Sequence, residues 1–386
     1  MKDFDFYFPT RIFFGKDCLK RFSQDLSALG KKAFFIYGKS HLKKSGLYAF
    51  ILEALKKKNI EWVEFGGIKP NPPLSQVIEG IRLAREFNPD FIVAVGGGSV
   101  IDAAKAISCG YFYGEKIWDF FERKGAPERA LPIITIPTIS GSGSEANEVT
   151  VITHDEKKIK LSLRASCLFP KVSYLDPTLT FTVPPNYTAY GVMDILSHLF
   201  EFFHFRLYYE ENLCEDLLVT LMKRLIKEGK KAYLEPENYS ARAQVMWIST
   251  LALSPWVRAG VGAYRFFLHS LEHPLSGTFD FPHGLGLTIL MRAYLKRFGH
   301  HAVVRRFYYK VFDLEEGKDL AKRGLKAFED ILNYFNLPKS LKECGLKKED
   351  LPQLIKKACE ILFIWKAERE FNKEIVQEIY EIAYEG

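Results

Sequence analysis

No apolar run in the 386-residue sequence reaches the ~18 residues that a membrane-spanning helix needs. The first residues carry scattered charges, and they lack the continuous apolar segment of a secretory signal peptide. We therefore expect a cytoplasmic protein that has no membrane partner.

Cysteine is scarce as well. Six cysteines are spread along the chain, and none of them belongs to a Cys-x-x-Cys pair. The pattern argues against a disulfide framework and is typical of reduced thiols in a cytoplasmic protein.

A strong excess of one charge is also absent. The formal net charge is +7, and lysines are spread along helix-like faces such as Ala54–Lys58. Solvated helix faces explain this distribution better than a continuous basic stripe, so we expect no nucleic-acid partner.

Strand-like and helix-like patterns alternate through the first half of the chain. Short apolar runs that we expect as strands are separated by segments with helical spacing, and they span residues 31–38, 60–66, 91–95, 131–136 and 172–175. Continuous apolar strands separated by helices are typical of a parallel sheet covered on both faces. Residues 148–163 add a β-hairpin pattern, and helical periodicity alone continues from Pro185.

Two loops that follow predicted strands can bind a dinucleotide, because parallel sheets bind ligands at the carboxyl ends of their strands. Three glycines and Ser99 follow the run 91–95 and precede a helix-like segment. Glycines let backbone N–H groups approach a diphosphate, and the helix N-terminus favours its charge. The loop Pro137–Glu145 is rich in hydroxyl groups that can donate to phosphate and ribose oxygens. The alternatives are a flexible strand–helix turn and a plain Ser/Gly linker, since neither segment is a GxGxxG or P-loop motif.

These patterns predict two domains. Residues 1–185 are expected to form an α/β, Rossmann-like dinucleotide-binding domain with a parallel sheet. Residues 186–386 are expected to form an all-α domain that holds metal and substrate.

Histidine is rare, yet three of the nine histidines lie between Phe267 and Gly284. His269 and His273 are four residues apart, so they share one face of a predicted helix. We expect that helix to end near Pro274 and a loop to return His283 toward the pair. Such an arrangement is typical of a metal site, although local hydrogen bonding of the three rings is an alternative.

A second pair, Asp194 and His198, is also four residues apart and has apolar neighbours. A carboxylate in such surroundings is costly unless it is paired or binds a metal. Imidazoles with one carboxylate suit Fe²⁺ or Zn²⁺, and no cysteine lies in these motifs. The residues alone do not decide whether His269 or His273 would be the ligand.

Four segments of the chain resemble, in order and spacing, the signature blocks of the iron-containing (group III) alcohol dehydrogenases. They are GGGSVIDAAKAI at 96–107, PTISGSGSEAN at 137–147, GVMDILSHLFE at 191–201 and HSLEHPLSGTFDFPHG at 269–284. The resemblance covers essentially the whole chain and is nearest to the NADPH-dependent butanol and broad-range aldehyde dehydrogenases. It implies hydride transfer between NADPH, with NADH as second choice, and an aldehyde or primary alcohol. It also implies a homodimer, and a metal and substrate site between the two domains.

The resemblance separates the histidines that the pattern left undecided. It implies a metal site with four ligands, which are Asp194, His198, His269 and His283. It places His273 near the nicotinamide and the substrate, where this ring orients groups or relays a proton. The cofactor contacts that it implies are Asn71, Gly97, Gly98, Ser99, Asp102, Thr138, Ser142 and Lys160.

The end of the first predicted strand bears on the choice between NADPH and NADH. An acidic residue there would bind the ribose 2′-hydroxyl and repel a 2′-phosphate, but Phe35–Leu47 contains no carboxylate. Gly38 leaves room, Ser40 offers a hydroxyl donor, and Lys39 or Lys43 can supply positive charge. The pattern favours NADPH. The alternative is that these lysines are solvated and that both cofactors are accepted.

Two other functions compete with the dehydrogenase. A polyol-phosphate dehydrogenase or a dehydroquinate-synthase-like lyase on the same scaffold needs basic residues for a phosphorylated substrate, and Arg265 is the nearest one to these motifs. A metal-dependent hydrolase would leave the glycine-rich loop unexplained. The residues expected to line the substrate pocket are Trp247, Trp256, Tyr264 and Phe267.

Overall fold

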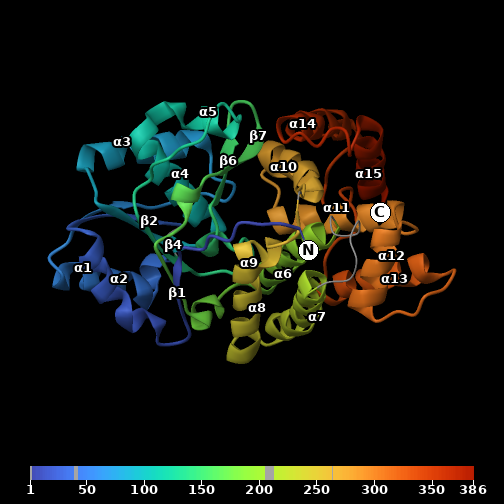
Figure 1. Cartoon of the computed structure of the whole chain (residues 1–386), viewed down its shortest axis with the longest axis horizontal. Helices are drawn as coiled ribbons and strands as arrows, with labels where there is room; N and C mark the ends of the chain where they lie inside the picture. Colours follow the sequence, from blue (N-terminus) through green and yellow to red (C-terminus); the bar gives the residue numbers. More distant parts are fainter. Residues whose placement is uncertain (1, 39–41, 205–212, 263) are drawn as a thin grey trace. The chain divides into compact units, whose positions relative to one another are not determined.

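The computed structural model describes residues 2–38, 42–204, 213–262 and 264–386. The described chain divides into two compact units (Figure 1). Phe8–Thr182 forms the sheet unit, and the residues before Phe8 join Val183–Gly386 in the helical unit. Within the described ranges, no helix has the length and apolar character required to cross a membrane.

A six-stranded parallel sheet forms the centre of the sheet unit, with the strand order β1-β8-β5-β4-β2-β3. The strands are β1 (Arg11–Phe14), β2 (Lys32–Tyr37), β3 (Glu61–Phe65), β4 (Phe91–Gly96), β5 (Ile133–Pro137) and β8 (Val172–Leu175). The central strands are continuous apolar runs because helices cover both faces of the sheet. The predicted fold class is therefore confirmed, whereas β1, a short strand at the sheet edge, was not predicted.

Helices cover the two faces of the sheet in pairs (Figure 1). The helices α1 (Phe22–Leu29) and α2 (Gly46–Lys57) pack on one face against alternate strand residues such as Phe35 and Val93. The helices α3 (Leu74–Phe87) and α4 (Gly98–Tyr113) cover the other face, and the short helix α5 (Ile117–Phe121) lies beside them. Gly110 lets α3 and α4 approach closely, since a Cβ there would lie 2.1 Å from the side chain of Ile81.

The predicted hairpin forms a separate two-stranded antiparallel sheet of β6 (Val149–His154) and β7 (Ile159–Arg164). The backbone N–H of Thr153 donates to the carbonyl of Pro72 at 3.0 Å, which fastens the hairpin to the segment before α3. Residues of the hairpin and of the 71–75 segment therefore lie side by side.

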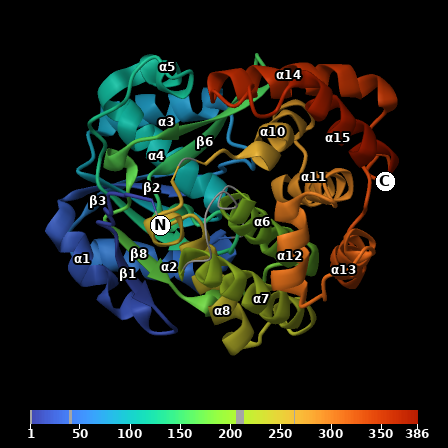
Figure 2. The ribbon, with the colours of Figure 1, turned by 45° about the vertical axis from the view of Figure 1, so that its right-hand side comes forward.

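The regular structure of the described residues of the helical unit is α-helical apart from a short 3-10 helix at Lys348–Asp350. The helices are α6 (Pro185–His204), α7 (Leu213–Leu234), α8 (Tyr239–Ala252), α9 (Pro255–Arg258), α10 (Phe267–Phe279), α11 (His283–Arg297), α12 (Ala302–Phe312), α13 (Leu320–Tyr334), α14 (Leu351–Ile364) and α15 (Lys373–Glu385). Within this unit α10 lies beside α14, and α11 lies beside α15 (Figure 2).

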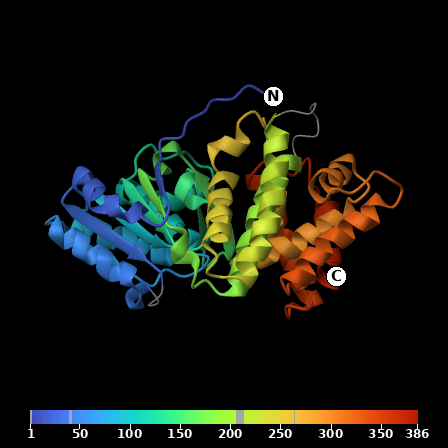
Figure 3. The same ribbon diagram turned by 90° about the horizontal axis from the view of Figure 1, so that it is seen from below.

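The first described residues, up to Tyr7, belong to the helical unit, and the sheet unit begins at Phe8. The expected domain bounds, 1–185 and 186–386, stay predictions. Figure 3 shows the N-terminus beside the helices of this unit. The N–H of Lys2 donates to the carbonyl of Gly260 at 3.2 Å, and the ring of Phe6 packs edge-on against Trp256 with centroids 5.0 Å apart.

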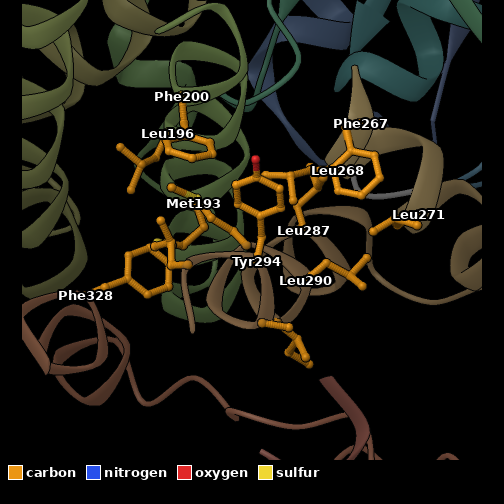
Figure 4. Close-up of a cluster of buried hydrophobic side chains, with 14 of the residues drawn as sticks. Met193, Leu196, Phe200, Phe267, Leu268, Leu271, Leu287, Leu290, Tyr294 and Phe328 are labelled. Atoms are coloured by element: carbon orange, nitrogen blue, oxygen red, sulfur yellow. The ribbon is translucent and has the colours of Figure 1, made fainter. Parts of the chain in front are cut away.

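Three helices, α6, α10 and α11, meet through a shared group of buried apolar side chains (Figure 4). Met193 and Leu196 come from α6, Leu271 from α10, and Leu287 and Leu290 from α11, and none of the five is exposed to solvent. Each such side chain contributes about 1.5–3 kcal/mol through burial. This packing fixes the relative positions of the three helices that carry the histidine motifs.

Helix α10 continues through Pro274 to Phe279, so the prediction that it ends near Pro274 was wrong. A proline inside a helix deprives the carbonyl four residues earlier, here that of Ser270, of its usual donor. The helix persists because every residue from Phe267 to Gly277 is buried in the helical unit. The hydroxyl of Tyr380 on α15 also donates to the carbonyl of Leu271 in the turn before the proline.

Candidate active site

The four predicted metal ligands come together in the helical unit. Asp194 and His198 lie one turn apart on α6, His269 lies on α10, and His283 is the first residue of α11. The donor atoms of Asp194, His198 and His269 all lie within 4.8 Å of one another. His283 Nε2 lies 3.9 Å from Asp194 Oδ1. Residues separated by up to 89 positions therefore face one small volume.

The donor set fits a divalent cation. His198 Nε2 lies 2.8 Å from His269 Nε2, and His283 Nε2 lies 3.9 Å from Asp194 Oδ1. A tetrahedral site with bonds of about 2.0–2.1 Å places its donors roughly 3.3–3.4 Å apart. The separations in this site bracket that value.

The electrostatics of the site favour neutral and anionic donors. Burial lowers the pKa of His198 well below its ordinary value, and the neighbouring rings of His269 and His283 lower it further. Burial also acts to lower the pKa of His269, but the carboxylate of Glu201 outweighs burial and raises it. A metal ligand must be deprotonated, so a bound cation would compete with a proton at His269.

Two glutamates that the sequence analysis did not single out bond two of the predicted ligand histidines. Glu201 accepts a hydrogen bond from His269 Nδ1, and Glu272 accepts one from His283 Nδ1. The exposed fractions of Glu201 and Glu272 are 3% and 0%. Donors of Glu272, His273 and His283 also form a compact group, but the Glu272 carboxylate already holds the ring of His283. The sequence signal that could have identified the two glutamates is their position inside apolar helical runs, because a buried charge requires a partner.

His273 lies one turn along α10 from His269 and outside the first donor group. It is 2% exposed, and its ring centroid is 6.2 Å from that of His269 and 5.8 Å from that of His283. The indole of Trp365 packs edge-on against it at 5.3 Å. His273 is thus next to the proposed ligands, and its donor atom groups with those of His283 and Glu272. Trp365 is a neighbour that sequence reasoning missed.

Aromatic rings cover one side of the histidine pair. Phe266 packs edge-on against His198 at 6.2 Å and against His269 at 5.1 Å. Tyr264 packs in turn against Phe266 at 5.4 Å and against Phe202 at 4.8 Å. These rings exclude water from that side of the site.

Only Tyr264 among the four residues expected to line the pocket lies in this aromatic group. Trp247 and Trp256 are 41% and 55% exposed, and Phe267 stacks on Phe371 in the core at 3.7 Å. The expectation for Trp247, Trp256 and Phe267 stays a prediction, because aromatic content near a motif does not reveal the direction of a side chain.

The predicted cofactor residues gather at one edge of the parallel sheet. Gly38, Gly97 and Thr138 directly follow β2, β4 and β5, which are adjacent strands. The registers place Tyr37 beside Val95 and Gly96 beside Pro137, so the three strands end together. This edge is where parallel α/β sheets bind their ligands. Ser40, which was predicted to contact the cofactor, lies outside the described residues.

The glycine-rich loop has the close approach that a diphosphate cradle requires. A Cβ on Gly98 would lie 2.2 Å from the Ser142 hydroxyl oxygen, and one on Gly97 would lie 2.6 Å from the side chain of Ile139. No side chain caps the N-terminus of α4, which begins at Gly98 and continues with Ser99. The first-turn N–H groups and the helix dipole therefore favour an anion.

Other predicted cofactor residues are held together by hydrogen bonds of the sheet unit. Lys160 Nζ on β7 donates to Asn71 Oδ1 at 3.0 Å, although 89 positions separate them. The Asp102 carboxylate accepts from the Ser144 hydroxyl at 2.6 Å and from the Val151 N–H at 3.2 Å. Burial raises the pKa of Asp102 to about 6, and the nearby Lys105 ammonium opposes this rise.

A carboxylate near the end of β2 comes from the neighbouring strand. The sequence analysis could not detect it, because it considered only the residues that follow β2 along the chain. Glu64 on β3 accepts hydrogen bonds from the hydroxyls of Tyr37 at 2.9 Å and Tyr48 at 3.0 Å. The ammonium of Lys43 lies 4.0 Å from the same carboxylate. Glu64 is therefore already engaged by two hydroxyl donors and a cation.

Comparisons with known proteins agree over both halves of the chain. The model of the iron-containing alcohol dehydrogenase family matches residues 9–177, and the model of the C-terminal part of that family matches residues 188–384. NADH-dependent butanol dehydrogenase A of Clostridium acetobutylicum is 34% identical over 367 residues, covering 93% of each chain. NADPH-dependent aldehyde reductase YqhD of Escherichia coli is 32% identical and covers 92% of this chain and 93% of its own. The crystal structure of NADH-dependent butanol dehydrogenase A from Thermotoga maritima matches with a TM-score of 0.94 and 34% identity, over 100% of this chain and 99% of that one.

Proposed function

Because the chain belongs to the iron-containing alcohol dehydrogenase family and is an alcohol and aldehyde oxidoreductase, we propose that it interconverts small aldehydes and primary alcohols with NADPH. The observation that carries the proposal is the convergence of a carboxylate and three imidazoles in the helical unit. Relatives whose names state butanol or aldehyde as substrate support a broad-range aldehyde of similar size.

The proposed metal ligands are Asp194, His198, His269 and His283. This donor set suits Fe²⁺ or Zn²⁺, both borderline cations that imidazole and carboxylate bind well. When bound, the metal supplies Lewis-acid polarisation of the substrate oxygen, and the nicotinamide supplies or accepts the hydride.

The chain's own residues exclude water and orient the substrate. The rings of Phe266 and Tyr264 exclude water from one side of the histidine group, which strengthens electrostatic interactions within it. We assign to His273, buried beside His283, the orientation of the substrate oxygen or the relay of a proton through its imidazole nitrogen.

In the sheet unit, the backbone N–H groups of Gly98 and Ser99 at the start of α4 are proposed to bind the diphosphate of the cofactor. The same proposal extends to side chains at this edge of the sheet, which are Asn71, Asp102, Thr138, Ser142 and Lys160. Gly38 leaves space beside β2, since a Cβ there would meet only the side chain of Val100 at 3.5 Å.

The function is tested by reducing butanal with NADPH and following the near-ultraviolet absorbance of the reduced nicotinamide. The metal-loaded wild type should oxidise NADPH only when butanal is present. His198→Ala should lose metal and turnover together, because it removes one donor of the buried set. If His198→Ala retained stoichiometric metal by elemental analysis, the ligand assignment would be wrong.

The competing functions are not favoured. A lyase or a polyol-phosphate dehydrogenase on this scaffold is not supported by the butanol dehydrogenase and aldehyde reductase relatives, and neither is a hydrolase. A homodimer and a cytoplasmic location stay predictions from the sequence, and light scattering of the purified protein tests the first of them.

A further inference from the structure

A short motif, His-x-x-Glu, occurs twice in the histidine-bearing helices. His198 precedes Glu201 on α6, and His269 precedes Glu272 on α10, each pair being three positions apart on one helix face. Each glutamate bonds a histidine outside its own pair. Glu201 binds the ring of His269, and Glu272 binds the ring of His283. We propose that Glu201 and Glu272 are positioning residues, each orienting the metal-binding histidine that follows it in the chain.

The first link joins α6 to α10. The Glu201 carboxylate accepts a hydrogen bond from the His269 ring and another from the backbone N–H of Leu268, at 2.6 Å. No side chain of α10 caps the N-terminus of that helix, so Glu201 supplies the missing acceptor from a different helix. One buried carboxylate thus fixes both the start of α10 and the ring that α10 presents.

The second link joins α10 to α11. Glu272 is fully buried and is held between the His283 ring and the Ser276 hydroxyl. Gly286 on α11 permits this approach, because a Cβ there would lie 2.8 Å from the Glu272 side chain. The carboxylate therefore fixes the first residue of α11 relative to α10.

Both links select the same imidazole nitrogen for the metal. A carboxylate can only accept, so each ring donates its Nδ1–H and keeps the lone pair on Nε2. His269 Nε2 faces His198 Nε2 at 2.8 Å, and His283 Nε2 faces Asp194 Oδ1 at 3.9 Å. Both free lone pairs are therefore directed into the proposed metal site.

The negative charge of the carboxylates makes a second contribution to metal affinity. With Asp194, the two glutamates place three carboxylates in or next to one buried site. Their combined charge favours a divalent cation over an empty site, and the glutamate hydrogen bonds raise the basicity of the rings. This inference rests on the proposed metal ligands but assigns a separate property, metal affinity, to residues that do not touch the metal.

The test measures metal affinity of the purified full-length protein, independently of turnover. Apoprotein is titrated with Zn²⁺ in competition with a chromophoric chelator, and Co²⁺ loading reports ligand geometry through its visible spectrum. Glu201→Gln and Glu272→Gln should each weaken Zn²⁺ binding by about 10- to 100-fold and change the Co²⁺ spectrum. The matched control is Glu228→Gln, since Glu228 is also buried in the helical unit but pairs with Arg224 at 3.2 Å. The control should bind Zn²⁺ as the wild type does.

The outcomes separate this inference from the proposed function. If both glutamine variants bind Zn²⁺ as tightly as the wild type, the positioning role is overturned while the ligand set stands. If the wild type itself binds no Zn²⁺, the ligand set fails and the inference falls with it. Should the glutamine variants not fold, Ser276→Ala leaves both glutamates in place and removes the hydroxyl that contacts Glu272 and, at 3.0 Å, the Phe281 carbonyl. It should weaken Zn²⁺ binding by about two- to tenfold. Unchanged binding by this variant would also overturn the role of Glu272.

Discussion

The Nε2 atoms of His198 and His269 face each other at 2.8 Å, and the two rings are stacked at an angle of 21°. Two neutral imidazoles in such a contact either share one Nε2 proton in a hydrogen bond or direct both Nε2 lone pairs at a cation between them. Burial and its neighbours keep the pKa of His198 well below its ordinary value, which disfavours a second proton in the pair. A bound cation would therefore replace a single shared proton.

The first prediction separates the two histidines of α10. His269→Ala should lose bound metal, because this ring belongs to the compact donor group. His273→Ala should keep stoichiometric metal and lose about 10²- to 10⁴-fold in kcat, the range that a proton-transfer group contributes. Elemental analysis measures the metal content of each variant, and butanal kinetics on the same preparations measure its kcat. Equal metal loss in both variants would contradict the separation.

The second prediction concerns the glycine cradle. Gly98→Ala would place a methyl group 2.2 Å from the Ser142 hydroxyl oxygen, in the space assigned to the diphosphate. Overpacking of about 1–3 kcal/mol corresponds to NADPH binding that is roughly 5- to 150-fold weaker, measurable by calorimetry. Gly46→Ala is the control, since a Cβ at Gly46 meets nothing within 4 Å. The two variants should have the same metal content, and equal NADPH affinity would remove Gly98 from the cradle.

Local patterns predicted those parts of the fold that depend on periodicity and on neighbours in sequence. The expected strand 31–38 contains β2, and the expected strand 91–95 covers all of β4 except its last residue. The prediction failed where distant residues override local preference, as at Pro274, where burial and the Tyr380 hydroxyl sustain the helix. A proline rule considers only the adjacent backbone and cannot include a donor that lies more than a hundred positions away.

For the site as well, local patterns predicted some residues, and contacts between distant parts of the chain decided the others. Spacing of four residues identified the pairs Asp194/His198 and His269/His273, because that spacing alone places side chains on one helix face. Glu64 was missed because the register of β2 against β3, which pairs Glu64 with Phe35, brings its carboxylate within reach of the Tyr37 hydroxyl, and the register is invisible in a single sequence. The directions of aromatic side chains, such as Trp256, were missed for the same physical reason: they depend on tertiary packing.

The third prediction concerns Lys105, which is completely buried on α4. Its ammonium donates to the Asn147 carbonyl at 2.8 Å, to Asn147 Oδ1 at 3.0 Å and to the Val149 carbonyl at 2.8 Å. These bonds hold the loop after β5 against α4. Lys105→Met would leave the three acceptors without this donor, so we expect the free energy of unfolding at pH 7 to fall by about 3 kcal/mol.

The pH dependence of that difference has a defined sign. Burial lowers the pKa of Lys105 from 10.5 to about 8, despite the opposing charge of Asp102. Because the folded protein binds the Lys105 proton less tightly than the unfolded chain does, the stability of the wild type rises as the pH increases from about 8 to 10.5, and this proton makes no pH-dependent contribution below about 8. The wild type should therefore gain stability relative to Lys105→Met between pH 8 and pH 10.5 in urea denaturation. Parallel curves over this range would contradict the assignment.

The fourth prediction is that NADPH is preferred over NADH. A carboxylate does lie near the end of β2, but Glu64 is occupied by the hydroxyls of Tyr37 and Tyr48 and lies 4.0 Å from the Lys43 ammonium. It is therefore poorly placed to bind a ribose hydroxyl, and the Lys43 charge offsets its repulsion of a phosphate. Two charge-assisted contacts to the 2′-phosphate, at about 1.5–3 kcal/mol each before desolvation, make a preference of roughly ten- to several-hundred-fold in kcat/KM reasonable.

Gly38→Asp tests this preference most directly. Position 38 has room for a side chain, because a Cβ there would approach only Val100, at 3.5 Å. The new carboxylate would bind the 2′-hydroxyl of NADH and repel the phosphate of NADPH, so the ratio of the two kcat/KM values should shift toward NADH by tenfold or more, about 1.4 kcal/mol. Glu64→Gln is the companion variant, and it should leave NADH use unchanged because Glu64 already serves the two tyrosines. Equal use of both cofactors by the wild type, or an unchanged ratio in Gly38→Asp, would place cofactor selection elsewhere than at the end of β2.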